Sequence, residues 1–179
     1  MTLDERYQAW KTRTLPDIKW GMTGDMPDRL DWLVENFSGL DTIVEFGSYQ
    51  GCSTVGWMKC KPKKLIAVDY KMYLDPDMHK QIANEAGIDF EFILEDDLKV
   101  SIPETDLLFI DTIHKANHTY QELTIHAHKA KKFIAFHDVN PERFTVHEGI
   151  EKYLLENPNI WETYYHDIND CGFMVLKRK

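Results

Sequence analysis

The sequence lacks a long apolar run, a Cys-x-x-Cys pair and the Gly-Lys-Ser/Thr ending of a Walker loop. Without an apolar run of about 18 residues we expect no membrane span, and the polar N-terminus predicts no secretory leader. The 3 cysteines are odd in number, which predicts reduced thiols in a cytoplasmic protein. Since no repeat or linker divides the chain, we expect one domain over residues 1–179, with a helical arm at 1–40 and a core at 41–179.

The charge balance narrows the range of partners. The 30 acidic residues outnumber the 21 basic ones, so the net charge is −9. This balance argues against a broad phosphate-binding surface, and therefore against a nucleic acid partner, although a local basic cleft stays open. The share of hydrophobic residues, 43%, is ordinary for a globular protein.

Apolar strand patterns alternate with amphipathic helix patterns through most of the chain. Strands are expected at 42–46, 64–69, 90–95, 106–111, 132–138, 160–166 and 172–178, and helices at 25–37, 52–60, 76–87, 118–131 and 141–157. Only five residues separate the last two strands, which demands antiparallel pairing. The order predicts an α/β fold: a Rossmann-like seven-stranded sheet, with five parallel strands, a C-terminal antiparallel hairpin and helices on both faces.

Four details of this pattern can be checked. Asp25 is a candidate N-cap, and Gly87 is expected to close the helix before it. Trp10 and Trp20 are expected to anchor the N-terminal arm by ordinary packing, with an active-site lid as the alternative. His126 and His128 stand two residues apart on a helix and are expected at the surface.

The stretch VEFGSYQGCS, residues 44–53, ends the first predicted strand. In open α/β sheets, ligands bind at the carboxyl ends of strands, and Gly47 and Gly51 would let the backbone bend there. The spacing E-x-G-x-x-x-G-x-S differs from the G-x-G-x-x-G of dinucleotide-binding loops. Because the carboxylate of Glu45 repels phosphate but attracts a cation, a cofactor with an amino-acid head group and a sulfonium would suit this loop. A simple turn is the alternative.

With its neighbours, this stretch resembles the class I S-adenosylmethionine-dependent methyltransferases over about residues 40–179. VEFGSYQGCS matches the first motif of that family, and LIAVDY, LEDDL and DLLFID supply acids at three later strand ends. The resemblance implies that S-adenosylmethionine (SAM) is bound by Glu45, Phe46, Gly47, Ser48, Tyr49, Gly51, Ser53, Asp69, Tyr70, Asp96, Asp97 and Asp111. The plainer alternatives are that Asp69 caps the next helix and that Asp96 and Asp97 form a solvated turn, with only one of the two at the cofactor.

A second group of motifs, DTIH, HTYQEL, FHDV and CGFMVLKR, is similar to small metal-dependent O-methyltransferases of the catechol type and of the cephalosporin-hydroxylase-like and macrolide-sugar group. The resemblance implies a divalent metal, Mg²⁺ or Mn²⁺, held by Asp111, His137 and Asp138. His114 would be the catalytic base beside Asp111, although four inserted residues leave His118 open for that role.

These resemblances imply an enzyme that transfers a methyl group from SAM to a hydroxyl oxygen of a small molecule or sugar, with help from a divalent metal. A non-catalytic SAM-binding module and a NAD-dependent oxidoreductase are the alternatives. Methylation of a nucleic acid base is a further one, but the D/N-P-P-Y/F signature of amino methyltransferases is missing. Neither the acceptor nor the oligomeric state can be read from the sequence.

Overall fold

The computed structural model describes residues 1–16, 18–20 and 23–179. The chain divides into two compact units, Met1–Glu95 and Asp96–Lys179. The strand directions confirm the predicted fold class, a Rossmann-like mixed sheet of seven strands with a C-terminal antiparallel hairpin. Among the described residues, no helix combines the length and the apolar character needed to cross a membrane.

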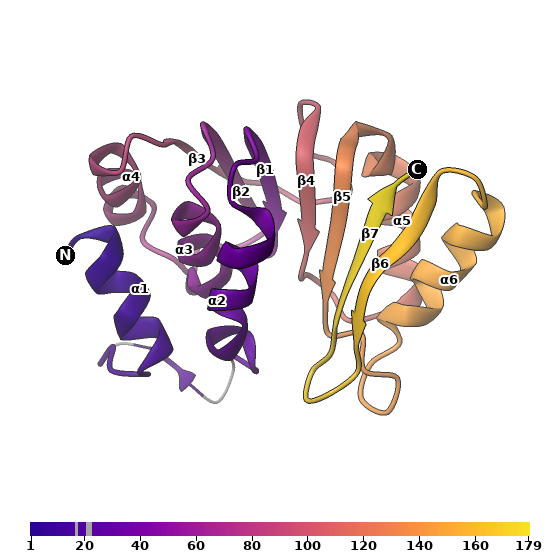
Figure 1. The fold of residues 1–179 in the computed structure, drawn as a ribbon, viewed down its shortest axis with the longest axis horizontal. Helices are drawn as coiled ribbons and strands as arrows, with labels where there is room; N and C mark the ends of the chain where they lie inside the picture. Colours follow the sequence, from indigo (N-terminus) through magenta and orange to yellow (C-terminus); the bar gives the residue numbers. More distant parts are fainter. Residues whose placement is uncertain (17, 21–22) are drawn as a thin grey trace. The chain divides into compact units, whose positions relative to one another are not determined.

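The first unit contains three parallel strands in the order β3-β2-β1 (Figure 1). These strands are β1 (Thr42–Phe46), β2 (Lys64–Asp69) and β3 (Asp89–Leu94). The helices of this unit are α1 (Leu3–Lys11), α2 (Met26–Phe37), α3 (Cys52–Lys59) and α4 (Pro76–Glu85). Every predicted strand and helix of this unit is present, with ends within one or two residues of the predicted ones.

The N-terminal arm packs on its own unit. Trp10 is completely buried, and its ring meets that of Trp20 edge to face at 5.3 Å between centroids, which confirms the packing role expected for the two residues. Residues 17, 21 and 22 of this arm lie outside the described part of the chain. Asp25 occupies the predicted N-cap position of α2, although its side chain makes no cap hydrogen bond. Its carboxylate instead pairs with Arg29, at 2.6 Å, one helical turn away.

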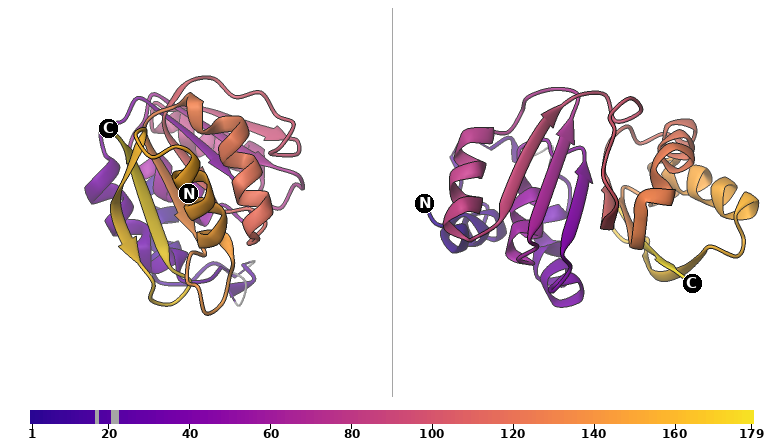
Figure 2. Two further views of the ribbon diagram at one scale, coloured as in Figure 1. Left: turned by 90° about the vertical axis from the view of Figure 1, so that its right-hand side faces the viewer. Right: turned by 90° about the horizontal axis from the view of Figure 1, so that it is seen from above.

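The second unit contains four strands in the order β4-β5-β7-β6. β4 (Thr105–Ile110) runs parallel to β5 (Ala130–His137), whereas β7 (Phe173–Arg178) is antiparallel both to β5 and to β6 (Trp161–Asp167). The helices are α5 (Ala116–His126), a 3₁₀ turn (Ala127–Lys129) and α6 (Val146–Glu156). Helices α5 and α6 lie side by side, as Figure 2 shows from two directions.

Two predicted helices of this unit are longer than the observed ones. The helix expected at 118–131 ends at His126, because β5 already begins at Ala130 to pair with Thr105. The helix expected from residue 141 begins at Val146. Asn140 prevents an earlier start, since its side-chain oxygen accepts the N–H of Glu142 and its carbonyl accepts those of the next two residues, which makes a local turn.

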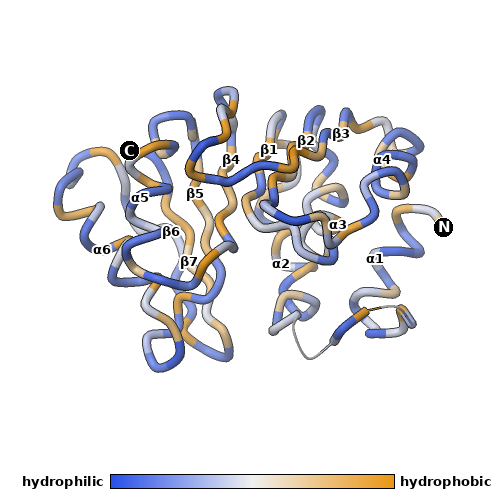
Figure 3. The backbone as a smooth tube through the Cα atoms, turned by 180° about the vertical axis from the view of Figure 1, so that it is seen from behind, coloured by the Kyte–Doolittle hydropathy of each residue, from blue (hydrophilic) through white to orange (hydrophobic). Residues whose placement is uncertain are grey.

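Hydrophobic residues run along the central strands of each unit, β1 and β2 in the first and β4 and β5 in the second (Figure 3). All residues of β4 are buried, as are the last four of β5, which agrees with the continuous apolar runs expected of parallel strands covered on both faces. The polar residues that follow such strands therefore stand at the border between the core and solvent.

The contact between α5 and α6 leads to a test. A Cβ atom at Gly149 would lie 2.3 Å from the carbonyl oxygen of Ala116, so Gly149→Ala should force the helices apart. We expect the free energy of unfolding to fall by roughly 1–3 kcal/mol, measured by urea denaturation. Glu151→Ala, at an exposed position of the same helix, is the control and should change it by less than about 0.5 kcal/mol. Equal effects of the two substitutions would contradict the close approach.

Candidate functional site

The loop between β1 and α3 is bent by three residues with positive φ. These are Gly47 (83°), Tyr49 (42°) and Gly51 (87°). The N–H of Gly47 donates to the carbonyl of Val68 on β2, at 2.8 Å. Such a backbone places the loop at the carboxyl end of β1 and starts α3 directly after Gly51.

A buried histidine explains why position 51 has no side chain. A Cβ atom there would lie 2.4 Å from Nε2 of His79, a fully buried residue of α4. The other ring nitrogen, Nδ1, lies 2.7 Å from the carbonyl oxygen of Asp75, and burial lowers the pKa of His79. The ring of His79 thus packs directly against the loop at Gly51. Nothing near His79 in the sequence signals this role, and it was not predicted.

Two acids of adjacent strands are buried beside this loop. Glu45 of β1 is fully buried, and its Oε2 accepts the hydroxyl of Thr54 at 2.6 Å. Asp69 ends β2, and its two oxygens accept the backbone N–H groups of Tyr49, at 2.9 Å, and Lys71, at 3.0 Å. Burial raises the pKa of Asp69, and these backbone bonds act against the rise.

The alternative role suggested for Asp69, a helix cap, belongs to another residue. Asp75 caps α4, since its side chain accepts the N–H of Met78 at 3.0 Å. Asp69 instead connects β2 to the bent loop after β1. A carboxylate oxygen can accept more than one hydrogen bond, so Asp69 keeps acceptor capacity for a ligand hydroxyl.

The other residues assigned to the cofactor in this unit differ in exposure. Phe46, Ser48 and Ser53 are buried, whereas Tyr70 is 68% exposed. The hydroxyls of Tyr70 and Tyr73 lie 3.4 Å apart, and the ring of Tyr73 also lies 4.8 Å from that of Tyr49. Tyr49, Tyr70 and Tyr73 thus form a group of aromatic rings that a flat ligand could contact.

In the second unit, four predicted residues form one group, which we call the Asp111 cluster: Asp111, His114, His137 and Asp138. Nε2 of His114 lies 2.7 Å from Oδ2 of Asp138 and 3.5 Å from Oδ1 of Asp111. Nδ1 of His137 lies 3.4 Å from an oxygen of each acid. The loops after β4 and β5 therefore bring together the residues predicted to hold a metal and to act as base.

Charge pairing shifts the titration of this cluster. Burial opposes a charge on His114, but its bonds to Asp111 and Asp138 outweigh burial and raise the pKa of His114 to about 9. The pKa values of both acids lie below their usual range, because the attraction of the two imidazoles exceeds the cost of burial. Asp138 also has a positive φ of 58°, a strained conformation typical of functional sites.

The donors of the Asp111 cluster suit a divalent cation. An oxygen of Asp111, one of Asp138 and a ring nitrogen of His114 lie within 4.8 Å of one another. Two carboxylates fit Mg²⁺ or Mn²⁺, and an imidazole ligand shifts the preference towards transition metals. Without an ion, the positive charge of His114 compensates only part of the negative charge of the two acids.

A second group, the Asp97 cluster, consists of Asp97, His118 and Glu122. Nε2 of His118 lies 2.7 Å from Oδ2 of Asp97 and 3.8 Å from Oε1 of Glu122. Nε2 of His126 lies 2.7 Å from the carbonyl oxygen of Asp97. His126 is thus buried, and its expected surface position is wrong, whereas His128 is exposed.

Glu122 was not among the predicted site residues, although it lies four residues after His118, on the same face of α5. His118 already has an acidic partner, whereas Asp96 lies outside this cluster. Asp96 pairs with Lys99 at 2.7 Å and accepts the N–H of Leu98 at 3.0 Å. Asp96 and Asp97, assigned together to the cofactor, thus have different surroundings.

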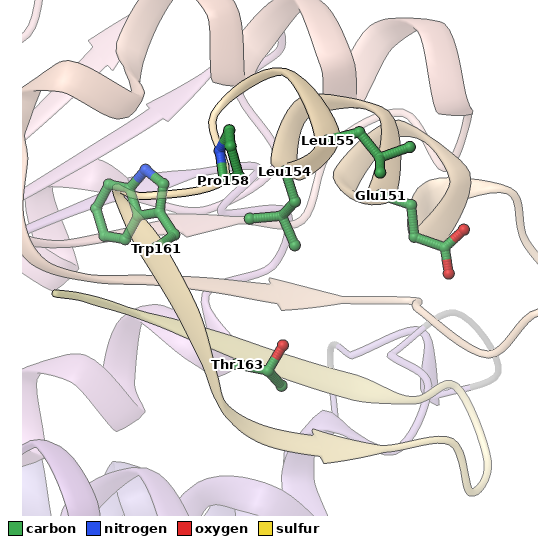
Figure 4. Close-up of a pocket in the computed structure, with 6 residues that line it drawn as sticks. All are labelled: Glu151, Leu154, Leu155, Pro158, Trp161 and Thr163. Carbon is green, nitrogen blue, oxygen red and sulfur yellow. The ribbon is translucent and has the colours of Figure 1, made fainter.

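A shallow pocket of about 480 Å³ lies between α6 and β6 (Figure 4). It is lined by Glu151, Leu154, Leu155, Pro158, Trp161 and Thr163. None of these lining residues belongs to the predicted site, whose residues lie at the loop after β1 and at the clusters of α5 and β5.

No protein-family model and no curated protein matches this chain. Solved structures do match it. Magnesium protoporphyrin IX methyltransferase from Synechocystis PCC 6803, with bound SAM, matches at a TM-score of 0.65 and 14% identity, covering 86% of this chain and 78% of that one. An O-methyltransferase from Bacillus cereus in complex with S-adenosylhomocysteine (SAH) matches at a TM-score of 0.62 and 17% identity. This match covers 99% of this chain and 90% of that one.

A third match, from Pyrococcus horikoshii, has been assigned as an RNA methyltransferase. It has a TM-score of 0.66 and 14% identity, and covers 99% of this chain and 97% of that one. At these identities the likeness concerns the fold. The chain therefore shares the fold of SAM-dependent methyltransferases, some of which are O-methyltransferases.

The Asp111 cluster predicts a pH dependence of stability in the metal-free protein. Because the folded-state pKa of His114 is about 9 and the ordinary value is 6.5, its stabilising effect is complete below pH 6.5 and is lost as the pH rises through 9. We expect His114→Asn to lower the free energy of unfolding at pH 6, and this deficit to shrink towards pH 10. Urea denaturation with a chelator present measures the difference.

His128→Asn replaces an exposed histidine of the same unit and is the control, with an effect near zero at every pH. A deficit in His114→Asn that stays constant from pH 6 to 10 would show that the side chain contributes by packing instead of by charge.

Proposed function

We propose that this protein is a SAM-dependent methyltransferase that methylates a hydroxyl oxygen of a small molecule or sugar with the help of a divalent metal. The observation that carries the proposal is the loop after β1, bent by Gly47 and Gly51 and bonded through the N–H of Tyr49 to the acid that ends β2. The shared fold supports it, since several of the matching solved structures contain SAM or SAH.

In this proposal the first unit binds the methyl donor. Asp69 would accept hydrogen bonds from the ribose hydroxyls, and Glu45 would favour the positively charged methionine end. Gly47, Ser48, Tyr49, Gly51 and Ser53 would line the cofactor, with Phe46 and Tyr70 beside them. SAM supplies a methyl group on a sulfonium, which is already activated for transfer.

The second unit would prepare the acceptor. Asp111 and Asp138, with His137, would hold a divalent ion, whose charge lowers the pKa of a bound hydroxyl. His114 is protonated near neutral pH as long as it pairs with both acids. A divalent ion beside His114 would disfavour a positive charge on its imidazole. His114 would then be neutral and able to take the proton of the acceptor hydroxyl.

The alternatives have less support. A NAD-dependent oxidoreductase should carry the shorter glycine spacing, which this loop lacks. A non-catalytic binding module would not need the Asp111 cluster. An RNA substrate has a precedent among the matching structures, but the net charge of −9 opposes binding to a phosphate backbone. We therefore retain a small acceptor and no nucleic acid.

Calorimetry with SAM and with NAD tests the first half of the proposal. We expect SAM to bind and NAD not to bind. Asp69→Asn should weaken SAM binding by at least about tenfold, because a bidentate acceptor of the ribose is lost. Asp77→Asn, at an exposed acid of the same unit, should bind SAM like the wild type. Binding of NAD but not of SAM would overturn the assignment.

Release of SAH from a panel of phenol, catechol and sugar acceptors, with and without Mg²⁺ or Mn²⁺, tests the second half. With any accepted substrate, Asp138→Asn should lower turnover by about a hundredfold or more, since metal assistance supplies several kcal/mol. Glu148→Gln changes an exposed acid of the same unit and should leave turnover intact. If turnover is the same with and without the metal, and is unchanged by Asp138→Asn, the reaction needs no metal and that part of the proposal is wrong.

A further inference from the structure

We propose that the Asp97 cluster is a second divalent metal site, separate from the Asp111 cluster, and that it takes a transition metal ion such as Zn²⁺. Its ligands would be an oxygen of Asp97, Nε2 of His118 and an oxygen of Glu122. This site goes beyond the proposed methyl transfer and does not depend on it.

The geometry brings three donors of the right kind together. One ligand atom from each of the three residues lies within 4.8 Å of the other two. His118 and Glu122 are one turn apart on α5 and present their side chains on the same face, a spacing that helical metal sites use. Asp97 comes from the segment after β3, so an ion there would connect two separate parts of the chain.

An unpartnered oxygen of Glu122 is a second observation, independent of the donor geometry, that indicates a cation site. This side chain is fully buried, and its Oε2 has no hydrogen-bond partner among the described residues. The other oxygen, Oε1, accepts the hydroxyl of Thr112 at 2.7 Å, and this bond orients the carboxylate, as hydrogen bonds to metal ligands commonly do. A buried carboxylate oxygen without a partner is costly, and a cation would compensate it.

The poorly hydrated acids of the Asp97 cluster also favour a bound cation. The side chains of Asp97 and His118 are only 12% and 13% exposed, so the acids in this cluster are poorly hydrated. Burial, followed by the charge of Asp97, raises the pKa of Glu122 well above its ordinary value. A divalent ion between Asp97 and Glu122 would compensate the charge of both acids. One nitrogen and two oxygens are a donor set that Zn²⁺ accepts, and a water can complete four-coordination.

The proposal separates the roles of the two histidines near the start of α5. His118, with Asp97 at 2.7 Å, would be a ligand in this second site, and His114, with Asp138 at 2.7 Å, would stay with the first. Asp97 would then be committed to the metal, and Asp96 would be the acid left for the cofactor.

Zinc titration of the Asp138→Asn protein tests this site without the contribution of the first one. We expect it to bind one Zn²⁺ in calorimetry and to release protons, so that the heat depends on the ionisation enthalpy of the buffer. Adding Glu122→Gln should weaken this binding by at least about a hundredfold, more than the loss of an outer-shell partner costs. His118→Asn should do the same, and Glu148→Gln, at an exposed acid, should not.

Co²⁺ gives a spectroscopic check, because an ordered site with a nitrogen ligand should produce visible absorption that Glu122→Gln abolishes. Circular dichroism establishes that each variant is folded, and Asp97→Asn replaces any variant that is not. No Zn²⁺ binding in the Asp138→Asn protein, or binding that Glu122→Gln and His118→Asn leave unchanged, would overturn the second site. Methyl transfer could fail in the same protein without affecting this result.

Discussion

Compensation of buried negative charge is the constraint on which the functional parts of this structure depend. Removing a carboxylate from water costs several kcal/mol unless donors or cations replace the lost hydration. The chain meets this cost with three kinds of partner: a hydroxyl for Glu45, backbone N–H groups for Asp69 and an imidazole for Asp138. The partners of Asp69 and Asp138 hold loops at strand ends, and the hydroxyl partner of Glu45 joins α3 to β1. The interactions that make burial tolerable therefore also shape the places where ligands can bind.

The second unit contains two acid–imidazole clusters of similar composition in different surroundings. The side chain of His114 is 40% exposed, whereas that of His118 is 13% exposed and has a fully buried acid beside it. An exposed imidazole can exchange protons with solvent or substrate, as a base must. A shielded one is better suited to hold a fixed ligand or a structural link. The difference in hydration, more than the kind of residue, separates the proposed roles.

The sequence was sufficient to predict the strands, their directions and the acids at their ends, because an apolar run followed by a polar residue is a local signal. Asp69 and Asp111 were placed at strand ends in this way, and Glu45, one residue before the end of β1, was singled out by the glycine loop that follows it. The contacts of His79 and His126 were not found, because they depend on how each helix is rotated about its axis, which packing decides. The true start of α6 was missed for a related reason: the turn at Asn140 competes with a helix pattern that continues through it.

The contact between His79 and Gly51 constrains the two positions unequally during evolutionary drift. A side chain at position 51 would clash with the imidazole ring and would also have to adopt an unfavourable positive φ. Loss of the histidine would remove the clash but leave the strained backbone conformation. Position 79 can therefore change while position 51 stays glycine, but the reverse order is blocked. Among descendants of this chain, a substitution at position 79 should therefore precede any at position 51.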